Sequence, residues 1–268
     1  MGKPILFISH ITEERGFALA LQEVLNDIYR NQLDIFVSSS KTNIDLGDNW
    51  IEKVNYNLEN MSMMIVLCSK ESYNRNWINY EAGVGIGKNI LVIPVIYGNL
   101  TIKELGLPLN QWELLKFEDS TFLEKIVIKI DKCCSIKSSL KNKIIHIENL
   151  RRVEKELFFY NRGMSVMNEL LKSTNDITNF FKIFLLTLES GYFNENPNIP
   201  IEGKFSDKYI SEFNEIVSKN NMQTHLKLER VLGKEQETEY NINGCLYKCK
   251  FIISEKLKDL YYNIVREI

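Results

Sequence analysis

Short apolar runs alternate with amphipathic segments over the first half of the chain. Between the runs, apolar side chains recur every three or four residues, as Phe17, Leu21, Val24 and Ile28 do after the first run. This spacing predicts helices, whereas short continuous apolar runs predict buried strands. The five predicted strands span residues 5–8, 33–37, 63–68, 90–96 and 114–117.

Strands that are apolar at every position are typical of a parallel sheet, because helices cover both of its faces. The first half therefore predicts an α/β domain at residues 1–135, with a five-stranded parallel sheet in the flavodoxin-like order. In such a sheet, ligands bind outside the carboxyl ends of the strands. We expect the chemistry of this half to lie there.

Residues 136–172 are charged and rich in helix formers, and they predict a helical linker. The linker leads to a mainly helical C-terminal domain at residues 173–268. In that domain, helical spacing and capping residues indicate four helices, and Asn243-Gly244 indicates the turn of a hairpin. The predicted helices span residues 177–188, 206–219, 221–232 and 255–265, and the hairpin spans residues 239–253.

Three helices followed by a hairpin form the outline of a winged helix-turn-helix domain. The segment that would enter DNA offers the phosphates only Lys227 and Arg230, and the wing carries Glu235, Glu237 and Glu239. Those carboxylates would repel the phosphate backbone. We therefore expect the domain to bind a trigger ligand or a partner protein. DNA binding is the alternative, and it would show a steep salt dependence.

The composition is that of a soluble globular protein, with 44% hydrophobic and 25% charged residues and a net charge of −2. This balance excludes a strongly polybasic nucleic-acid binder. No apolar stretch has the length of a membrane span, and the start lacks the pattern of a signal peptide. The five cysteines lack zinc-site spacing, so we expect reduced thiols in a cytoplasmic protein and no metal.

Small hydroxyl residues end three successive predicted strands, at Ser9, Ser38 and Ser69. The helix after the third strand carries Trp77 and Glu81, whose i, i+4 spacing places them on one face. Together these residues outline a cleft that suits a sugar or a phosphate. The alternative is that the serines only form turns, and that the helix is an ordinary amphipathic one with its Trp packed inward and its Glu solvated.

Four segments of the first half resemble the TIR domain family in their order and spacing, and in particular its bacterial NAD-consuming members. The resemblance covers about residues 3–135. It implies the flavodoxin-like fold and one of two activities, which are hydrolysis or cyclisation of NAD⁺ and signalling as a non-enzymatic adaptor. The segments are Ile-Leu-Phe-Ile-Ser-His at 5–10, Phe-Val-Ser-Ser at 36–39, Leu-Gly-Asp-Asn-Trp-Ile at 46–51 and Trp-Ile-Asn-Tyr-Glu-Ala-Gly at 77–83.

The resemblance implies that Glu81 is catalytic and that the loop at residues 39–47 governs self-assembly and gates the site. Cleavage of the nicotinamide–ribosyl bond produces an oxocarbenium-like ribose, which a carboxylate near the 2′ and 3′ hydroxyls would stabilise. Trp77 would form a wall against the ribose or the nicotinamide. The other substrate-binding candidates are Ser9, His10 and Ile11 after the first strand, Ser38 after the second, and Asp45 and Gly47 in the loop.

We therefore expect an NAD⁺ glycohydrolase or cyclase that self-association activates, in bacterial anti-phage defence or signalling. NAD⁺ is then the substrate, and no cofactor is expected. A lone His10 is not assigned a proton transfer. Gly83, Gly85 and Gly87 follow a helix rather than a strand, so we expect them to permit close packing and to end the helix rather than to form a dinucleotide-binding fingerprint. The alternative is an adaptor that recruits partners through residues 39–47.

Overall fold

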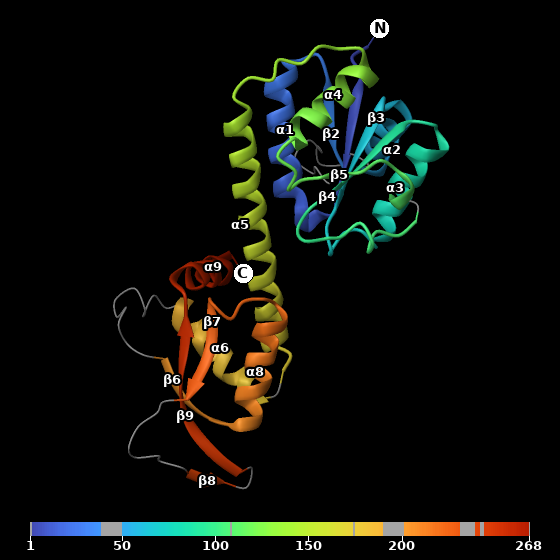
Figure 1. Ribbon diagram of the computed structural model, residues 1–268. Coiled ribbons are helices and arrows are strands. Elements are labelled where there is room, and N and C mark those ends of the chain that lie inside the picture. The colour runs from blue at the N-terminus through green and yellow to red at the C-terminus, as the bar shows by residue number, and fades with distance from the viewer. Residues whose placement is uncertain are drawn as a thin grey trace. The chain divides into compact units, whose positions relative to one another are not determined.

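The computed structural model describes residues 2–38, 50–107, 109–173, 175–189, 201–230, 239–241 and 244–267. The chain forms two compact units, Met1–Phe158 and Phe159–Ile268. The long helix α5 (Lys143–Leu170) contributes residues to both (Figure 1).

The first unit is built on a five-stranded sheet in the order β2-β1-β3-β4-β5, and every neighbouring pair runs parallel (Figure 1). This order is the flavodoxin-like one, so the predicted fold class of the first half is confirmed. The strands are β1 (Ile5–Ser9), β2 (Asp34–Val37), β3 (Met63–Cys68), β4 (Leu91–Ile96) and β5 (Leu115–Lys116).

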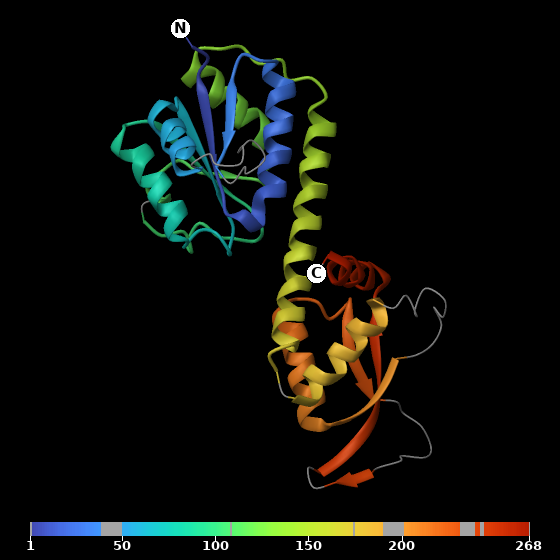
Figure 2. The same ribbon diagram turned by 180° about the vertical axis from the view of Figure 1, so that it is seen from behind.

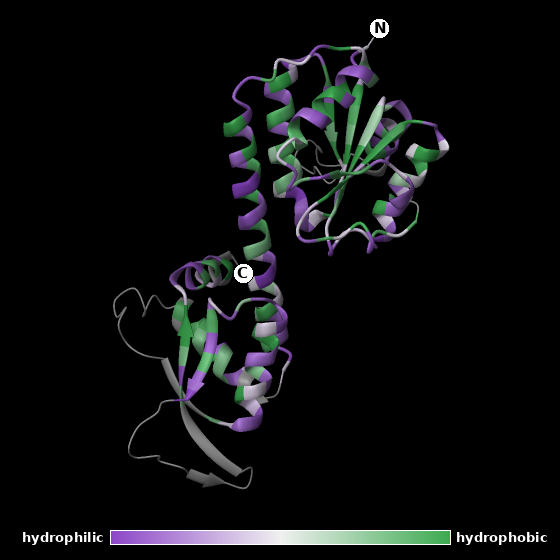
Figure 3. Ribbon diagram, viewed as in Figure 1, coloured by the Kyte–Doolittle hydropathy of each residue, from purple (hydrophilic) through white to green (hydrophobic). Residues whose placement is uncertain are grey.

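Helices cover both faces of this sheet (Figures 1 and 2). Along β1, Leu6 and Ile8 belong to one buried cluster and Phe7 to the other. Because each side of the strand meets a helical layer, its residues are hydrophobic without alternation, as Figure 3 shows for the central strands. The first layer contains α1 (Arg15–Tyr29), α4 (Phe122–Cys134) and the start of α5, and the second contains α2 (Trp50–Asn60) and α3 (Asn76–Gly87).

Gly85 lets α3 approach the sheet closely. A Cβ atom at this position would lie 2.7 Å from Cγ2 of Val92 on β4, which is too close for a real side chain. Gly83 and Gly87 have open space around the same position. Close packing therefore explains the middle glycine of α3 and not the other two, while Gly87 ends the helix, as predicted.

The second unit combines helices with an antiparallel sheet in the order β6-β9-β7, with β8 paired to β9. The hairpin between β8 and β9 is the predicted one, and the C-terminal region is mainly helical, as predicted. Ser206 caps α8 by accepting a hydrogen bond from the backbone N–H of Tyr209. The elements are α6 (Asn175–Glu189), β6 (Ile201–Ser206), α8 (Asp207–Lys219), β7 (Leu226–Arg230), β8 (Glu239–Asn241), β9 (Gly244–Ile253) and α9 (Glu255–Glu267).

One predicted helix of the second unit is wrong, and with it the winged-helix outline. The segment predicted as the helix at 221–232 contains the strand β7, which pairs with β9. In β7, Leu226 and Leu228 are buried while Lys227 and Glu229 are exposed, and this is the two-residue period of a strand. The strand β6 was also missed, because Pro200 and Gly203 indicate a loop when they are considered alone.

In the part of the chain that the structure describes, none of the helices combines the length and the hydrophobicity needed to cross a bilayer.

Candidate active site

A cavity of about 440 Å³ lies where the chain leaves β1 and β2, beside the first turn of α3. This is the switch point of the sheet, where the connections after β1 and β3 lead in opposite directions. Four of the predicted site residues reach the cavity together, namely His10, Ile11, Ser38 and Trp77. The complete lining is His10, Ile11, Thr12, Glu13, Ser38, Arg75, Asn76 and Trp77.

Glu81 lies on α3, one turn after Trp77, and it is completely buried. Among the described residues, neither of its carboxylate oxygens has a hydrogen-bond partner of normal geometry. Burial raises the pKa of Glu81 to about 8, and the nearby Ser9 hydroxyl and Trp77 indole offset only part of this rise. Glu81 is therefore mostly protonated at neutral pH, and it does not line the cavity in this state.

Ser9 is the last residue of β1 and is also completely buried. Its Oγ, like the carboxylate of Glu81, has no hydrogen-bond partner of normal geometry among the described residues. Buried polar atoms in folded proteins nearly always have partners. Ser9 and Glu81 thus have hydrogen-bonding capacity that the described residues do not satisfy.

His10 is buried beside Ser38 at the cavity. Its Nδ1 lies 3.4 Å from the Ile8 carbonyl oxygen and 3.4 Å from Ser38 Oγ. Burial lowers the pKa of His10 to about 4, and the positive charge of Arg15 contributes to this decrease. The imidazole is therefore neutral at physiological pH and brings no positive charge to the cavity.

The other predicted site residues, Asp45 and Gly47, lie outside the described residues, as does the rest of the loop at 39–47.

A second buried carboxylate, Glu14, joins the chain after β1 to the chain after β3. The Ser69 hydroxyl donates a hydrogen bond to Glu14 Oε1 and also lies 2.7 Å from Glu71 Oε2. Ser72 closes the turn, since its Oγ accepts from the backbone N–H of Ser69 at 2.8 Å. Burial raises the pKa of Glu14 to about 7, although the hydrogen bond from Ser69 favours its charged form.

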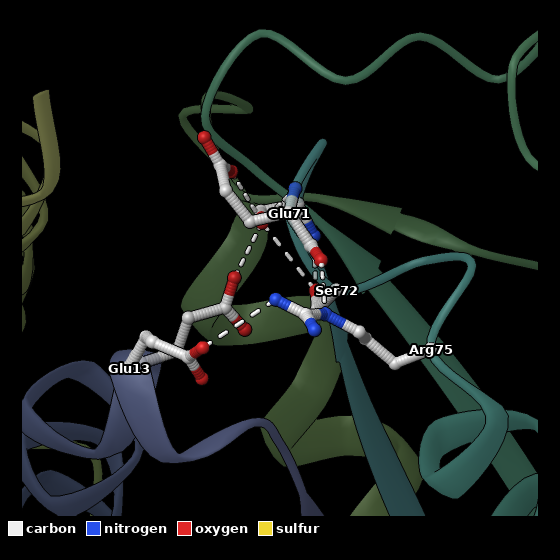
Figure 4. Close-up of polar contacts among 6 residues, drawn as sticks. Glu13, Glu71, Ser72 and Arg75 are labelled. Carbon is white, nitrogen blue, oxygen red and sulfur yellow. Dashed lines mark hydrogen bonds and ion pairs between the residues drawn. The ribbon is translucent and has the colours of Figure 1, made fainter. Parts of the chain in front are cut away.

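An ion pair makes a second link between the same two segments. Arg75 Nη2 lies 3.4 Å from Glu13 Oε1, and Arg75 Nε donates to the Glu71 carbonyl oxygen at 3.1 Å. Figure 4 shows Glu13 and Arg75 facing each other, with Glu71 and Ser72 beside them. Both members of the pair line the cavity.

Sequence reasoning missed several residues of this region, namely Thr12, Glu13, Glu14, Arg75 and Asn76. The signal for them was their position, because each lies within six residues of a predicted strand end or of Trp77. Within the described ranges, His, Cys, Asp and Glu side chains form no group of three that could hold a metal ion.

Residues 6–127 match the family model described as the TIR domain. The TIR domain of the Toll-related receptor TRR-2 from Hydra magnipapillata is 19% identical, with a TM-score of 0.38, over 47% of this chain and 96% of that chain. A TIR-STING receptor from C. gigas, solved in complex with 2′,3′-cGAMP, is 11% identical, with a TM-score of 0.37, over 99% of this chain and 87% of that chain. No curated protein matches the chain. A TIR domain thus occupies residues 6–127, and the cavity and Glu81 lie within it.

Proposed function

We propose that this TIR domain cleaves the bond between nicotinamide and ribose in NAD⁺, with Glu81 as its catalytic residue. The observation that carries the proposal is the buried Glu81 carboxyl group, which has no hydrogen-bond partner of normal geometry among the described residues and lies one turn from the cavity wall formed by Trp77. A buried polar group without such partners costs on the order of 1–3 kcal/mol of stability, and more when it is charged. A binding or catalytic role explains why the fold carries such a cost.

The chemistry of NAD⁺ suits this group. Nicotinamide leaves as a neutral base from a cationic ring, so the reaction needs little help from a general acid. The ribose becomes positively charged in the transition state, and the Glu81 carboxylate would offset that charge while accepting hydrogen bonds from the ribose hydroxyls. Ser9 would supply a hydroxyl to the same group. Water or the adenine ring then takes the ribosyl cation, which gives hydrolysis or cyclisation.

The proposal includes an activating movement, because Glu81 does not reach the cavity surface in this structure. Trp77 lies on the same face of α3 and is partly exposed, so a shift of its indole would open a path to the carboxylate. We attribute the trigger to self-association of TIR domains, in the setting of bacterial anti-phage defence or signalling. A ligand or partner of the second unit would control that association.

The test is the loss of NAD⁺ from solutions of the purified full chain, with the products separated by chromatography. Wild type should release nicotinamide together with ADP-ribose or its cyclic form, and Glu81→Gln should reduce the rate by at least about a hundredfold, as expected for loss of transition-state charge stabilisation. Glu59→Gln changes an exposed carboxylate on α2 and should behave as wild type. Equal rates in wild type and Glu81→Gln would exclude the catalytic role.

A non-enzymatic adaptor is the second candidate, and the complete burial of Glu81 away from the cavity favours it. In that case no NAD⁺ would be lost even when light scattering shows the protein assembled. Partner binding would then survive Glu81→Gln.

A further inference from the structure

We propose that Arg75 binds the diphosphate of the substrate, and that Glu13 holds its guanidinium at the cavity while the site is empty. This inference rests on the proposed function, in which the substrate is a dinucleotide. Glu81 supplies one end of such a site and would repel phosphates when it is charged. A second feature is therefore needed to attract them.

Arg75 is the one basic side chain among the described residues that line the cavity. The neutral His10 adds no positive charge there. The planar guanidinium of arginine matches phosphate oxygens with two parallel hydrogen bonds, and this makes it a common phosphate ligand. The charge balance of the cavity thus points to Arg75.

The ion pair with Glu13 is weak enough to be exchanged for a phosphate. Its two atoms lie 3.4 Å apart, and the side chains of Arg75 and Glu13 are 56% and 53% exposed. Exposed pairs of this kind contribute little to stability, so breaking one costs little. Glu13 therefore positions the guanidinium without holding it permanently.

The first turn of α3 also favours a phosphate ligand. Arg75 is the N-cap residue of this 12-residue helix, and no side chain among the described residues caps the free N–H groups of the first turn. Those N–H groups and the helix dipole favour an anion at this end. From Arg75 to Glu81 the helix rises six residues, about 9 Å, so the phosphate and ribose ends of one extended substrate would lie at separate points along α3.

The experiment is calorimetric titration of the full chain with ADP-ribose. This molecule contains the diphosphate of NAD⁺ but lacks the nicotinamide–ribosyl bond. Arg75→Gln should weaken binding by about tenfold or more, since it removes charge-assisted hydrogen bonds. Glu13→Gln should strengthen binding by a few-fold, because the guanidinium no longer has a competing partner. The affinity of Arg75→Lys should lie between those of wild type and Arg75→Gln, because lysine keeps the positive charge but cannot form the two parallel hydrogen bonds of a guanidinium.

Arg152→Gln is the matched control, because Arg152 forms an exposed ion pair with Glu156 on α5. It should bind ADP-ribose as wild type does, and a thermal melt of each variant would confirm folding. Binding of ADP-ribose requires no bond cleavage, so this titration can succeed with the wild type even if NAD⁺ cleavage fails. Equal affinity in wild type and Arg75→Gln, or no binding of ADP-ribose to wild type, would overturn the inference.

Discussion

Glu14 and Glu81 are both buried in this TIR domain, and the surroundings of their carboxyl groups differ. Glu14 accepts a hydrogen bond from Ser69 and ties two segments of the chain together. Glu81 has no such donor in normal geometry among the described residues. This difference in hydrogen bonding between the two buried carboxyl groups is visible in the structure, and the sequence alone does not show it.

Activity should rise with pH, because the proposed role of Glu81 requires its charged form and burial raises its pKa to about 8. Below that value, kcat/KM for NAD⁺ should increase roughly tenfold per pH unit and then level off. His10, with a pKa of about 4, stays neutral over this range and adds no further step. Steady-state kinetics between pH 6 and 9 would check this profile.

Glu14 also titrates near this range, with a pKa of about 7, so the same profile should be measured for Glu14→Gln. That variant should keep the step near pH 8. A profile that is flat, or that falls as the pH rises, would contradict the assignment of Glu81.

The free energy of unfolding should fall as the pH rises, because burial raises the pKa of Glu81. The pKa of Glu81 is higher in the folded protein than in the unfolded chain, so the folded state binds the extra proton between about pH 4.5 and 8. The stability gained at low pH is lost as the pH increases through this window, by on the order of a few kcal/mol. Glu81→Gln should therefore lose less stability than Glu59→Gln between pH 5 and 9. Urea denaturation at both pH values would measure it, and equal losses would show that Glu81 is not protonated in the fold.

At the scale of elements, the strands of the first unit could be predicted from the sequence, because each apolar run allowed only one interpretation. The run at 63–68, which became β3, is apolar throughout, and its neighbours carry clear helical spacing. In the second unit, β7 and β6 were missed because polar and apolar residues are mixed in each of them. Pairing with β9 stabilises both strands, and this long-range contact leaves no mark in the local pattern.

The candidate site also contains some residues that the sequence predicts and others that only the structure shows. His10, Ile11, Ser38 and Trp77 could be predicted from strand ends and from the resemblance, because the fold places strand ends at one edge. The pairing of Glu13 with Arg75 joins residues 62 positions apart in the chain. Only the folded arrangement shows such a pair.

The hydrogen bond between Glu14 and Ser69 should stabilise the link between the segments that follow β1 and β3. Glu14→Ala should lower the free energy of unfolding by roughly 1–3 kcal/mol, since it removes this buried hydrogen bond and leaves Glu71, in the same segment as Ser69, as the remaining acceptor of the Ser69 hydroxyl. Ser69→Ala should cost a similar amount. In a double-mutant cycle the two changes should be clearly non-additive. Additive effects in urea denaturation would show that the bond contributes nothing.

For the whole molecule, the boundary between the two units falls within α5 rather than at the end of α4. Ile147 and Leu150 of α5 are buried in the core of the first unit. A fragment of residues 1–158 should therefore fold cooperatively and be more stable than one of residues 1–135, by roughly 2–5 kcal/mol for the loss of two buried aliphatic side chains. Thermal and urea unfolding of both fragments would measure this. Equal stability would place the boundary of the TIR domain before α5.

The central claim is that Glu81 breaks the nicotinamide–ribosyl bond, and nicotinamide release tests it most directly. The full-length wild type and Glu81→Gln should be compared at the same concentration and the same degree of assembly, as judged by light scattering. We predict that wild type releases nicotinamide from NAD⁺ and that Glu81→Gln does so at least about a hundredfold more slowly. Release at the same rate by both proteins, or by neither when assembled, would contradict the account.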